Sequence, residues 1–141
     1  MKGEKGKAMY YFAYGPELDR RHMGAICPGA KPHLSADLPH YRLVFSGWSR
    51  QWRGSTATLQ ASSGDRVMGG LYEISDQDLS RLDKNAGVPV SATRFSVRVF
   101  PDTGPAVDAV THVNVRGAEA GKPSAEYLTL IKQGYRQWGL V

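Results

Sequence analysis

Short extended segments constrain the fold of this chain most, because they recur along its length and are separated by turns. The first runs from Met9 to Tyr14, is rich in aromatic residues and ends at Gly15-Pro16, which predicts a buried strand followed by a tight turn. Comparable patterns predict further strands at 41–46, 56–61, 67–74, 95–99 and 107–115. Hairpin turns are predicted at 62–65 and 101–104, and a surface loop at 24–39, which contains three prolines and two glycines.

Helix signals occur at three places. Residues 17–23 predict a short helix with acidic residues in its first turn. Ser75 is a candidate N-cap for a helix that is expected to run to Lys84, and Ser124 is a candidate N-cap for a last helix. Apolar residues at helical spacing predict the buried faces of these two helices: Leu79 and Leu82, then Tyr127, Leu128, Ile131 and Tyr135. The order of elements favours an α+β domain built on a closed or half-closed sheet.

Length and composition narrow the classes of protein to consider. A chain of 141 residues has the size of one domain, which we place at 9–141 after a tail at 1–8. No apolar run approaches the ~20 residues of a membrane span, and no signal-peptide pattern is present. A single cysteine, Cys27, excludes an intrachain disulfide and favours the reducing cytoplasm. The four histidines lack metal-ligand spacing, so neither a metal nor another cofactor is expected.

The net charge is +5, but the basic residues are scattered, which argues against a nucleic-acid partner. We expect a small-molecule partner and no membrane partner. The oligomeric state stays open, a homodimer included.

Four separated segments together carry a family resemblance. Phe12–Leu18 is similar to the pattern Phe-x-Tyr-Gly-Ser-Asn-Leu, and Leu82–Gly87 is similar to Leu-Asp-x-x-Glu-Gly. The other two segments are Val67–Ser75 and Lys122–Leu128, the latter followed by Gly134. In this order and at this spacing they resemble the gamma-glutamylcyclotransferase family, with its AIG2-like members. The resemblance implies a small mixed β-barrel flanked by helices.

The resemblance also implies a chemistry. Family enzymes, lyases or acyltransferases in type, release 5-oxoproline or a similar lactam when the α-amine of a γ-glutamyl group attacks its own γ-carbonyl. A carboxylate must first take a proton from that amine, and loop amides bind the carboxylate of the substrate. The implied site is therefore a pocket for a γ-glutamyl or related small acyl-amine ligand. Its expected binding residues are Tyr14, Gly15, Pro16, Glu17, Leu18 and Tyr127.

Three positions depart from the family pattern. Pro16 stands where Ser is usual and has no amide hydrogen to donate. Glu17 stands where Asn is usual, and its charge would repel a substrate carboxylate. Ala86 stands where the resemblance places the catalytic Glu, and losing a general base commonly costs ~10²–10⁴-fold in rate.

Several interpretations of the acidic residues remain open. Glu17 is a candidate replacement base, which would make the protein a divergent active cyclotransferase; alternatively it is a helix N-terminal acid that points to solvent. Asp83 is interpreted as stabilising its helix or the loop that follows; the alternative is that it acts as the base. Without a base, the chain would be a non-catalytic binding or scaffold domain.

One aromatic and basic cluster, Trp48–Arg53, also has two interpretations. It forms the rim of a pocket, with Arg50 and Arg53 toward an anionic or aromatic ligand, or its tryptophans pack on the barrel while its arginines stay in water.

Overall fold

The computed structural model of the chain describes residues 8–141, and most of the predicted tail lies outside the described residues. Five strands form one closed barrel in the order β1-β3-β2-β4-β5. The elements in chain order are β1 (Met9–Ala13), the 3-10 helix η2 (Pro16–Leu18), α1 (Arg20–Ile26), β2 (Lys31–Ser49), β3 (Gly54–Ile74), α2 (Asp76–Ala86), β4 (Ala92–Pro101), β5 (Val107–Asn114) and α3 (Ala125–Gln137).

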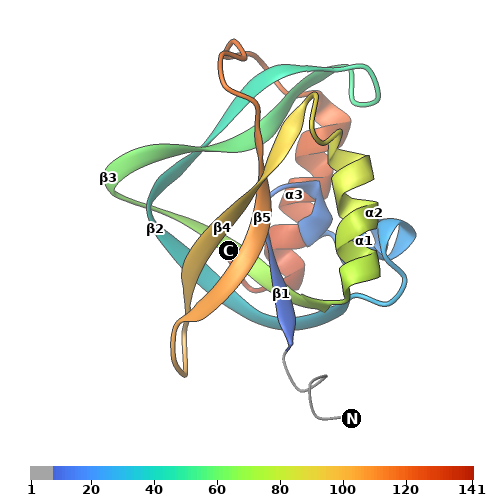
Figure 1. Cartoon of the computed structure of the whole chain (residues 1–141). Coiled ribbons are helices and arrows are strands. Elements are labelled where there is room, and N and C mark those ends of the chain that lie inside the picture. Colours follow the sequence, from blue (N-terminus) through green and yellow to red (C-terminus); the bar gives the residue numbers. More distant parts are fainter. Residues whose placement is uncertain (1–7) are drawn as a thin grey trace.

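The barrel is mixed, because β1 pairs in parallel with β5 at Tyr11 and Val110 while the other strand pairs are antiparallel. The helices gather on one side of it in Figure 1. The prediction of an α+β fold with a small mixed barrel flanked by helices is confirmed.

The two longest strands differ from the sequence prediction. The expected loop at 24–39 is wrong from Lys31 onward, because β2 begins there and continues for 19 residues. Pro32 and Pro39 lie at register irregularities of the β2–β3 pair, where a missing amide hydrogen does little harm. The hairpin turn expected at 62–65 is also wrong. These residues bulge out of one continuous strand, β3, opposite the single residue His40.

Helix starts agree with the capping signals at two of the three places. Ser75 caps α2 in a capping box with Asp78, and the helix ends two residues beyond the predicted Lys84. Ser124 caps α3 through the amide of Tyr127. The single helix predicted at 17–23 is wrong, because the chain forms η2 first and α1 then starts after its own cap, Asp19. No helix among residues 8–141 is both long and apolar enough to cross a membrane.

Alternation along β1 divides the core into two clusters. Phe12 and Tyr14 point into the barrel, where they join residues from the other strands and Tyr127 of α3. Tyr11 and Ala13 point the other way, into a second cluster beneath the helices. The loop after β1 therefore connects the barrel interior to the layer of helices.

Candidate ligand-binding site

A cavity of about 450 Å³ opens at one end of the barrel. Its walls come from the places where β1, β2, β5 and α2 end and where β3, β4 and α3 begin, so segments far apart in the sequence meet there. Five of the six predicted binding residues line it: Tyr14, Gly15, Pro16, Glu17 and Tyr127. The structure places Leu18 elsewhere. Its fully buried side chain packs in the cluster under the helices, and its carbonyl accepts a hydrogen bond from Trp138 Nε1 at 2.8 Å.

Glu17 turns its carboxylate toward this cavity although the residue lies in a helical turn. A methyl group built on Gly15 would lie 3.6 Å from Glu17 Oε1 and 3.5 Å from the Tyr127 hydroxyl oxygen. Both polar groups therefore border the space directly above Gly15. Glu17 is half-buried, lies in the first turn of η2 and lines the cavity.

Tyr127 brings a neutral hydroxyl to the site from the first turns of α3. Its oxygen accepts a hydrogen bond from the backbone amide of Ala57 at 2.7 Å, and its ring packs edge-on against Trp52. Burial, and then the charge of Glu17, raise the pKa of Tyr127 well above its ordinary value. The hydroxyl therefore keeps its proton at neutral pH and can donate it to a ligand or to the Glu17 carboxylate.

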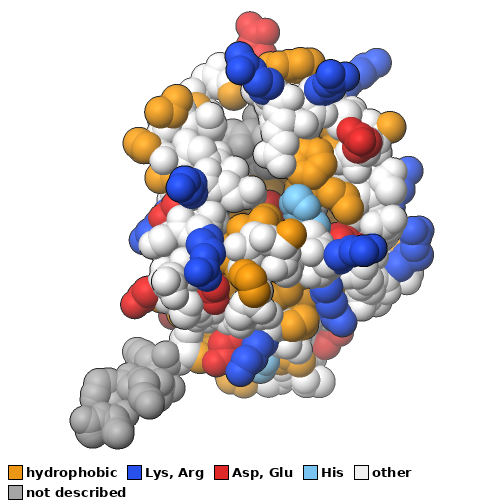
Figure 2. Space-filling view, turned by 90° about the vertical axis from the view of Figure 1, so that its right-hand side faces the viewer, with side chains coloured by type: hydrophobic (Ala, Val, Ile, Leu, Met, Phe, Trp, Pro, Cys, Tyr) orange, Lys and Arg blue, Asp and Glu red, His pale blue; other side chains and the backbone are white. Residues whose placement is uncertain are grey.

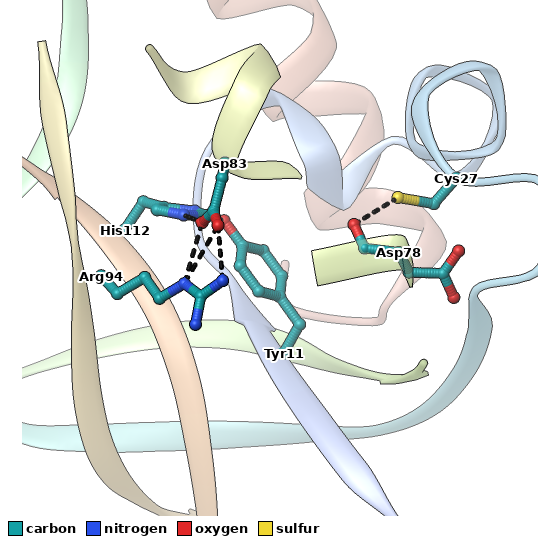
Figure 3. A network of polar contacts seen from close by, with 6 residues as sticks. All are labelled: Tyr11, Cys27, Asp78, Asp83, Arg94 and His112. Atoms are coloured by element: carbon teal, nitrogen blue, oxygen red, sulfur yellow. Dashed lines mark hydrogen bonds and ion pairs between the residues drawn. The ribbon is translucent and has the colours of Figure 1, made fainter. Parts of the chain in front are cut away.

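Ala86, the last residue of α2, lines the cavity with a methyl group only. Asp83 lies one turn earlier and is already engaged: it accepts hydrogen bonds from Arg94 at 2.6 Å and from His112 Nε2 at 2.7 Å (Figure 3). The hydrogen bond from Arg94 is the main cause that lowers the pKa of Asp83. Asp83 thus ties α2 to β4 and β5 as an ionised carboxylate.

Sequence reasoning did not select Tyr11 and His112, which also line the cavity. The Tyr11 hydroxyl lies 2.9 Å from His112 Nδ1, and the His112 side chain is only 7% exposed. The two residues are 101 positions apart, and the parallel contact between β1 and β5 is what joins them. Tyr11 and His112 belong to two separate predicted strands, and no local pattern in the sequence links them.

Some residues of the aromatic and basic cluster Trp48–Arg53 match the packing interpretation, and others match the rim interpretation. Trp52 packs on Tyr127, as the packing interpretation expects. Trp48 is 74% exposed at the cavity rim, and the exposed Arg50 also lines the cavity, as the rim interpretation expects. Arg53 is exposed and is not part of the cavity wall.

The remaining His, Cys, Asp and Glu side chains offer neither a metal site nor a reactive thiol in the described part of the chain. In the described part of the chain, no three His, Cys, Asp or Glu side chains come together as a metal site. Cys27 is fully buried, its Sγ donates to the carbonyl of Asp78, and burial raises its pKa to about 11. On the face drawn in Figure 2, Lys and Arg side chains are scattered among other residues.

Comparison with known proteins agrees with this architecture. A sequence profile of the AIG2-like family matches residues 66–141, more than half of the chain. The gamma-glutamylcyclotransferase of Mus musculus is 27% identical over 98% of this chain and 76% of its own length, and that of Bos taurus is 28% identical over 99% and 77%.

Among solved structures, one described as gamma-glutamyl cyclotransferase superposes with a TM-score of 0.90 at 27% identity, over 95% of this chain and 82% of its own. The barrel with its adjoining helices therefore defines a gamma-glutamylcyclotransferase-like fold. This chain belongs to the AIG2-like family.

Proposed function

We propose that this protein binds a γ-glutamyl compound, or a related small acyl amine, in the cavity at the end of the barrel. The observation that carries the proposal is the convergence of the Glu17 carboxylate and the Tyr127 hydroxyl above Gly15. A cavity of about 450 Å³ has the volume that small-molecule sites typically have, ~300–1,000 Å³. The relatives named gamma-glutamylcyclotransferase support this choice of ligand class.

The charges in the cavity suggest how such a ligand would lie. At a separation of about 4 Å and an effective dielectric of ~20, the Glu17 carboxylate attracts a cationic amine by about 4 kcal/mol. It repels a carboxylate at the same place as strongly. The ligand α-ammonium group therefore belongs at Glu17.

The ligand carboxylate has few loop amides left to bind it. Pro16 has none, and the amides of Leu18 and Asp19 already donate to the carbonyls of Gly15 and Pro16 at 3.0 Å. The amides of Gly15 and Glu17 are the ones that this loop can offer to the ligand.

A second candidate function is cyclotransfer with Glu17 as the general base, and the position of its carboxylate in the cavity favours it. Glu17 would take one proton from the ammonium group, and the amine nitrogen would then attack the γ-carbonyl carbon. The new C–N bond closes the lactam as the old amide C–N bond breaks, and the departing amine receives the two protons that the attacking nitrogen loses. Ala86 supplies no acid or base to this reaction.

Calorimetric titration with γ-glutamylalanine, together with an assay for 5-oxoproline, tests both functions. Wild type should bind the ligand, and Glu17→Gln should weaken binding at least tenfold. The matched control is Glu73→Gln, which removes an exposed carboxylate from β3 and should change nothing. Equal binding by wild type and Glu17→Gln would contradict the proposed ligand orientation. Turnover by wild type that Glu17→Gln abolishes would support the second function; turnover that only Ala86→Glu creates would support the binding role.

A further inference from the structure

A chain of hydrogen bonds adjoins the cavity that Ala86 lines. Neither candidate function assigns a role to the residues of this chain. It runs from the Tyr11 hydroxyl to His112 Nδ1 at 2.9 Å, and from His112 Nε2 to Asp83 Oδ1 at 2.7 Å (Figure 3). The three residues come from β1, β5 and α2. Tyr11 and His112 line the same cavity as Ala86 and Glu17.

We propose that Tyr11, held and assisted by His112 and Asp83, is the proton-accepting group of this cavity in place of the acid missing at position 86. The inference rests on cyclotransfer in this cavity, which is the reaction of the second candidate function, but makes Tyr11 and not Glu17 the base of that reaction. It assigns a different task to Glu17, which holds the ligand ammonium group by its charge.

The partners of His112 assign its tautomer. Asp83 is ionised, and a carboxylate only accepts hydrogen bonds, so Nε2 carries the hydrogen of the imidazole. Nδ1 is then the free acceptor, and the Tyr11 O–H donates to it. The lone pairs of the Tyr11 oxygen are left to accept a hydrogen bond from a ligand amine. Asp83 orients the imidazole and stabilises its cationic form, as carboxylates do behind catalytic histidines.

Ala86 gives the ligand access to this chain of residues. Asp83 and Ala86 are three residues apart on α2 and so lie on the same face of the helix. Asp83 reaches His112, while the methyl group of Ala86 occupies little of the space next to it. Ala86, Tyr11 and His112 all line the cavity.

Burial, and then the charge of Glu17, raise the pKa of Tyr11 well above its ordinary value, so the free tyrosinate is scarcely populated at neutral pH and is not available as the resting base. A relay avoids that species. The Tyr11 oxygen accepts a proton from the ligand ammonium as its own proton passes to His112 Nδ1, giving an imidazolium beside Asp83. After the amine attacks the γ-carbonyl and the amide C–N bond breaks, the same proton returns through Tyr11 to the departing amine. A second proton moves from the attacking nitrogen to the departing one, so the enzyme ends unchanged.

Side chains from three other elements surround the relay at His112. Asp83 faces it from α2, Tyr11 from β1, and Arg94 approaches the shared carboxylate from β4. Tyr14 donates to the His112 backbone carbonyl. Only a neutral His112 can accept the proton, so the rate should fall toward acid pH.

The test is the rate of 5-oxoproline release from γ-glutamylalanine, measured against pH for wild type, Tyr11→Phe, His112→Gln and Glu17→Gln, with binding measured in parallel. Tyr11→Phe should lower kcat ~10²–10⁴-fold, the usual size of general acid–base catalysis, and leave Kd within threefold. His112→Gln should lower kcat and remove the acidic fall in rate. Glu17→Gln should raise KM far more than it lowers kcat. The control Tyr10→Phe alters the neighbouring side chain, which packs on His33 instead, and should behave as wild type.

A Tyr11→Phe variant that is folded, binds ligand and keeps the wild-type kcat overturns the relay, whatever His112→Gln does. Loss of kcat in Glu17→Gln alone likewise overturns it, in favour of Glu17 as base. A wild type that binds γ-glutamylalanine but releases no 5-oxoproline at any pH overturns the relay and leaves the binding proposal standing. Failure to bind the ligand contradicts the proposed function itself.

Discussion

Asp83 shows how one side chain can serve stability and the candidate site together. Its carboxylate is one-fifth exposed and holds three elements by hydrogen bonds to His112 and Arg94. Because its pKa is lowered in the folded protein, Asp83 stabilises the fold above the ordinary carboxyl pKa of ~3.9, and this contribution is lost as pH falls through the lower folded value.

We therefore predict that Asp83→Asn lowers the free energy of unfolding at pH 7 by about 1 kcal/mol. The effect is this small because Arg94 is half exposed, so solvent screens its ion pair with Asp83. The difference from wild type should shrink as pH falls below the ordinary carboxyl pKa and Asp83 takes up a proton. Urea denaturation across this pH range measures it. Asp108→Asn is the matched control, since Asp108 pairs with Arg98 on the surface and both side chains are mostly exposed. An equal loss in both variants would refute the specific role of Asp83.

Individual site residues could be predicted from the sequence only where a local pattern pointed to them. The resemblance of Phe12–Leu18 to the family pattern led to Tyr14, Gly15 and Glu17, and all three line the cavity. The orientation of Glu17 was not predictable, because it depends on Gly15 lying against Tyr127 of α3, more than a hundred residues away. Tyr11 and His112 likewise meet only through closure of the barrel.

At the scale of elements, η2 and α3 pack so closely that a side chain has no room between them. A Cβ built on Gly134 of α3 would lie 2.8 Å from the backbone carbonyl carbon of Leu18 and 2.9 Å from the amide nitrogen of Asp19. This contact fixes the loop that carries Pro16 and Glu17 against the helix that carries Tyr127. The geometry of the candidate site thus depends on a glycine outside it.

Gly134→Ala should therefore lower the free energy of unfolding by ~1–3 kcal/mol, as overpacking commonly does, and should also weaken ligand binding by displacing the loop. Gly24→Ala in α1 is the matched control, because nothing lies within 4 Å of its new methyl group. It should instead stabilise the protein by ~0.5–1 kcal/mol through helix propensity. Thermal and urea denaturation of the two variants compare them. A Gly134→Ala protein as stable as wild type would contradict the close packing.

The elements themselves were predictable to different degrees. Ser75 and Ser124 marked two helix starts correctly, because a cap is a local interaction within a few residues. The extents of β2 and β3 were not predictable from local patterns. Pro32, Pro39 and the segment 62–65 resemble breaks in isolation, yet pairing between two long strands continues across all of them. That pairing is a property of the closed barrel.

At the scale of the whole molecule, the cavity draws its walls from both halves of the chain and from both core clusters. The proposed ligand would contact the loop after β1, the end of α2 and the start of α3 simultaneously. These three segments are far apart in the unfolded chain, so the ligand should bind the folded state alone. Binding must then raise the stability of the entire fold by linkage.

We predict that γ-glutamylalanine at 100 times its Kd raises the free energy of unfolding by about 2.7 kcal/mol and shifts the melting temperature upward by several degrees. Differential scanning calorimetry measures the shift. Glutarylalanine keeps the acyl chain and carboxylates but lacks the α-amine, so it has no cation to place at Glu17 and should produce little shift. Glu17→Gln should make the two compounds nearly equal. If glutarylalanine raised the melting temperature of wild type as much as γ-glutamylalanine does, the cavity would not be recognising the amine. The reason is that stabilisation by linkage reports only the contacts that the folded protein makes with the ligand.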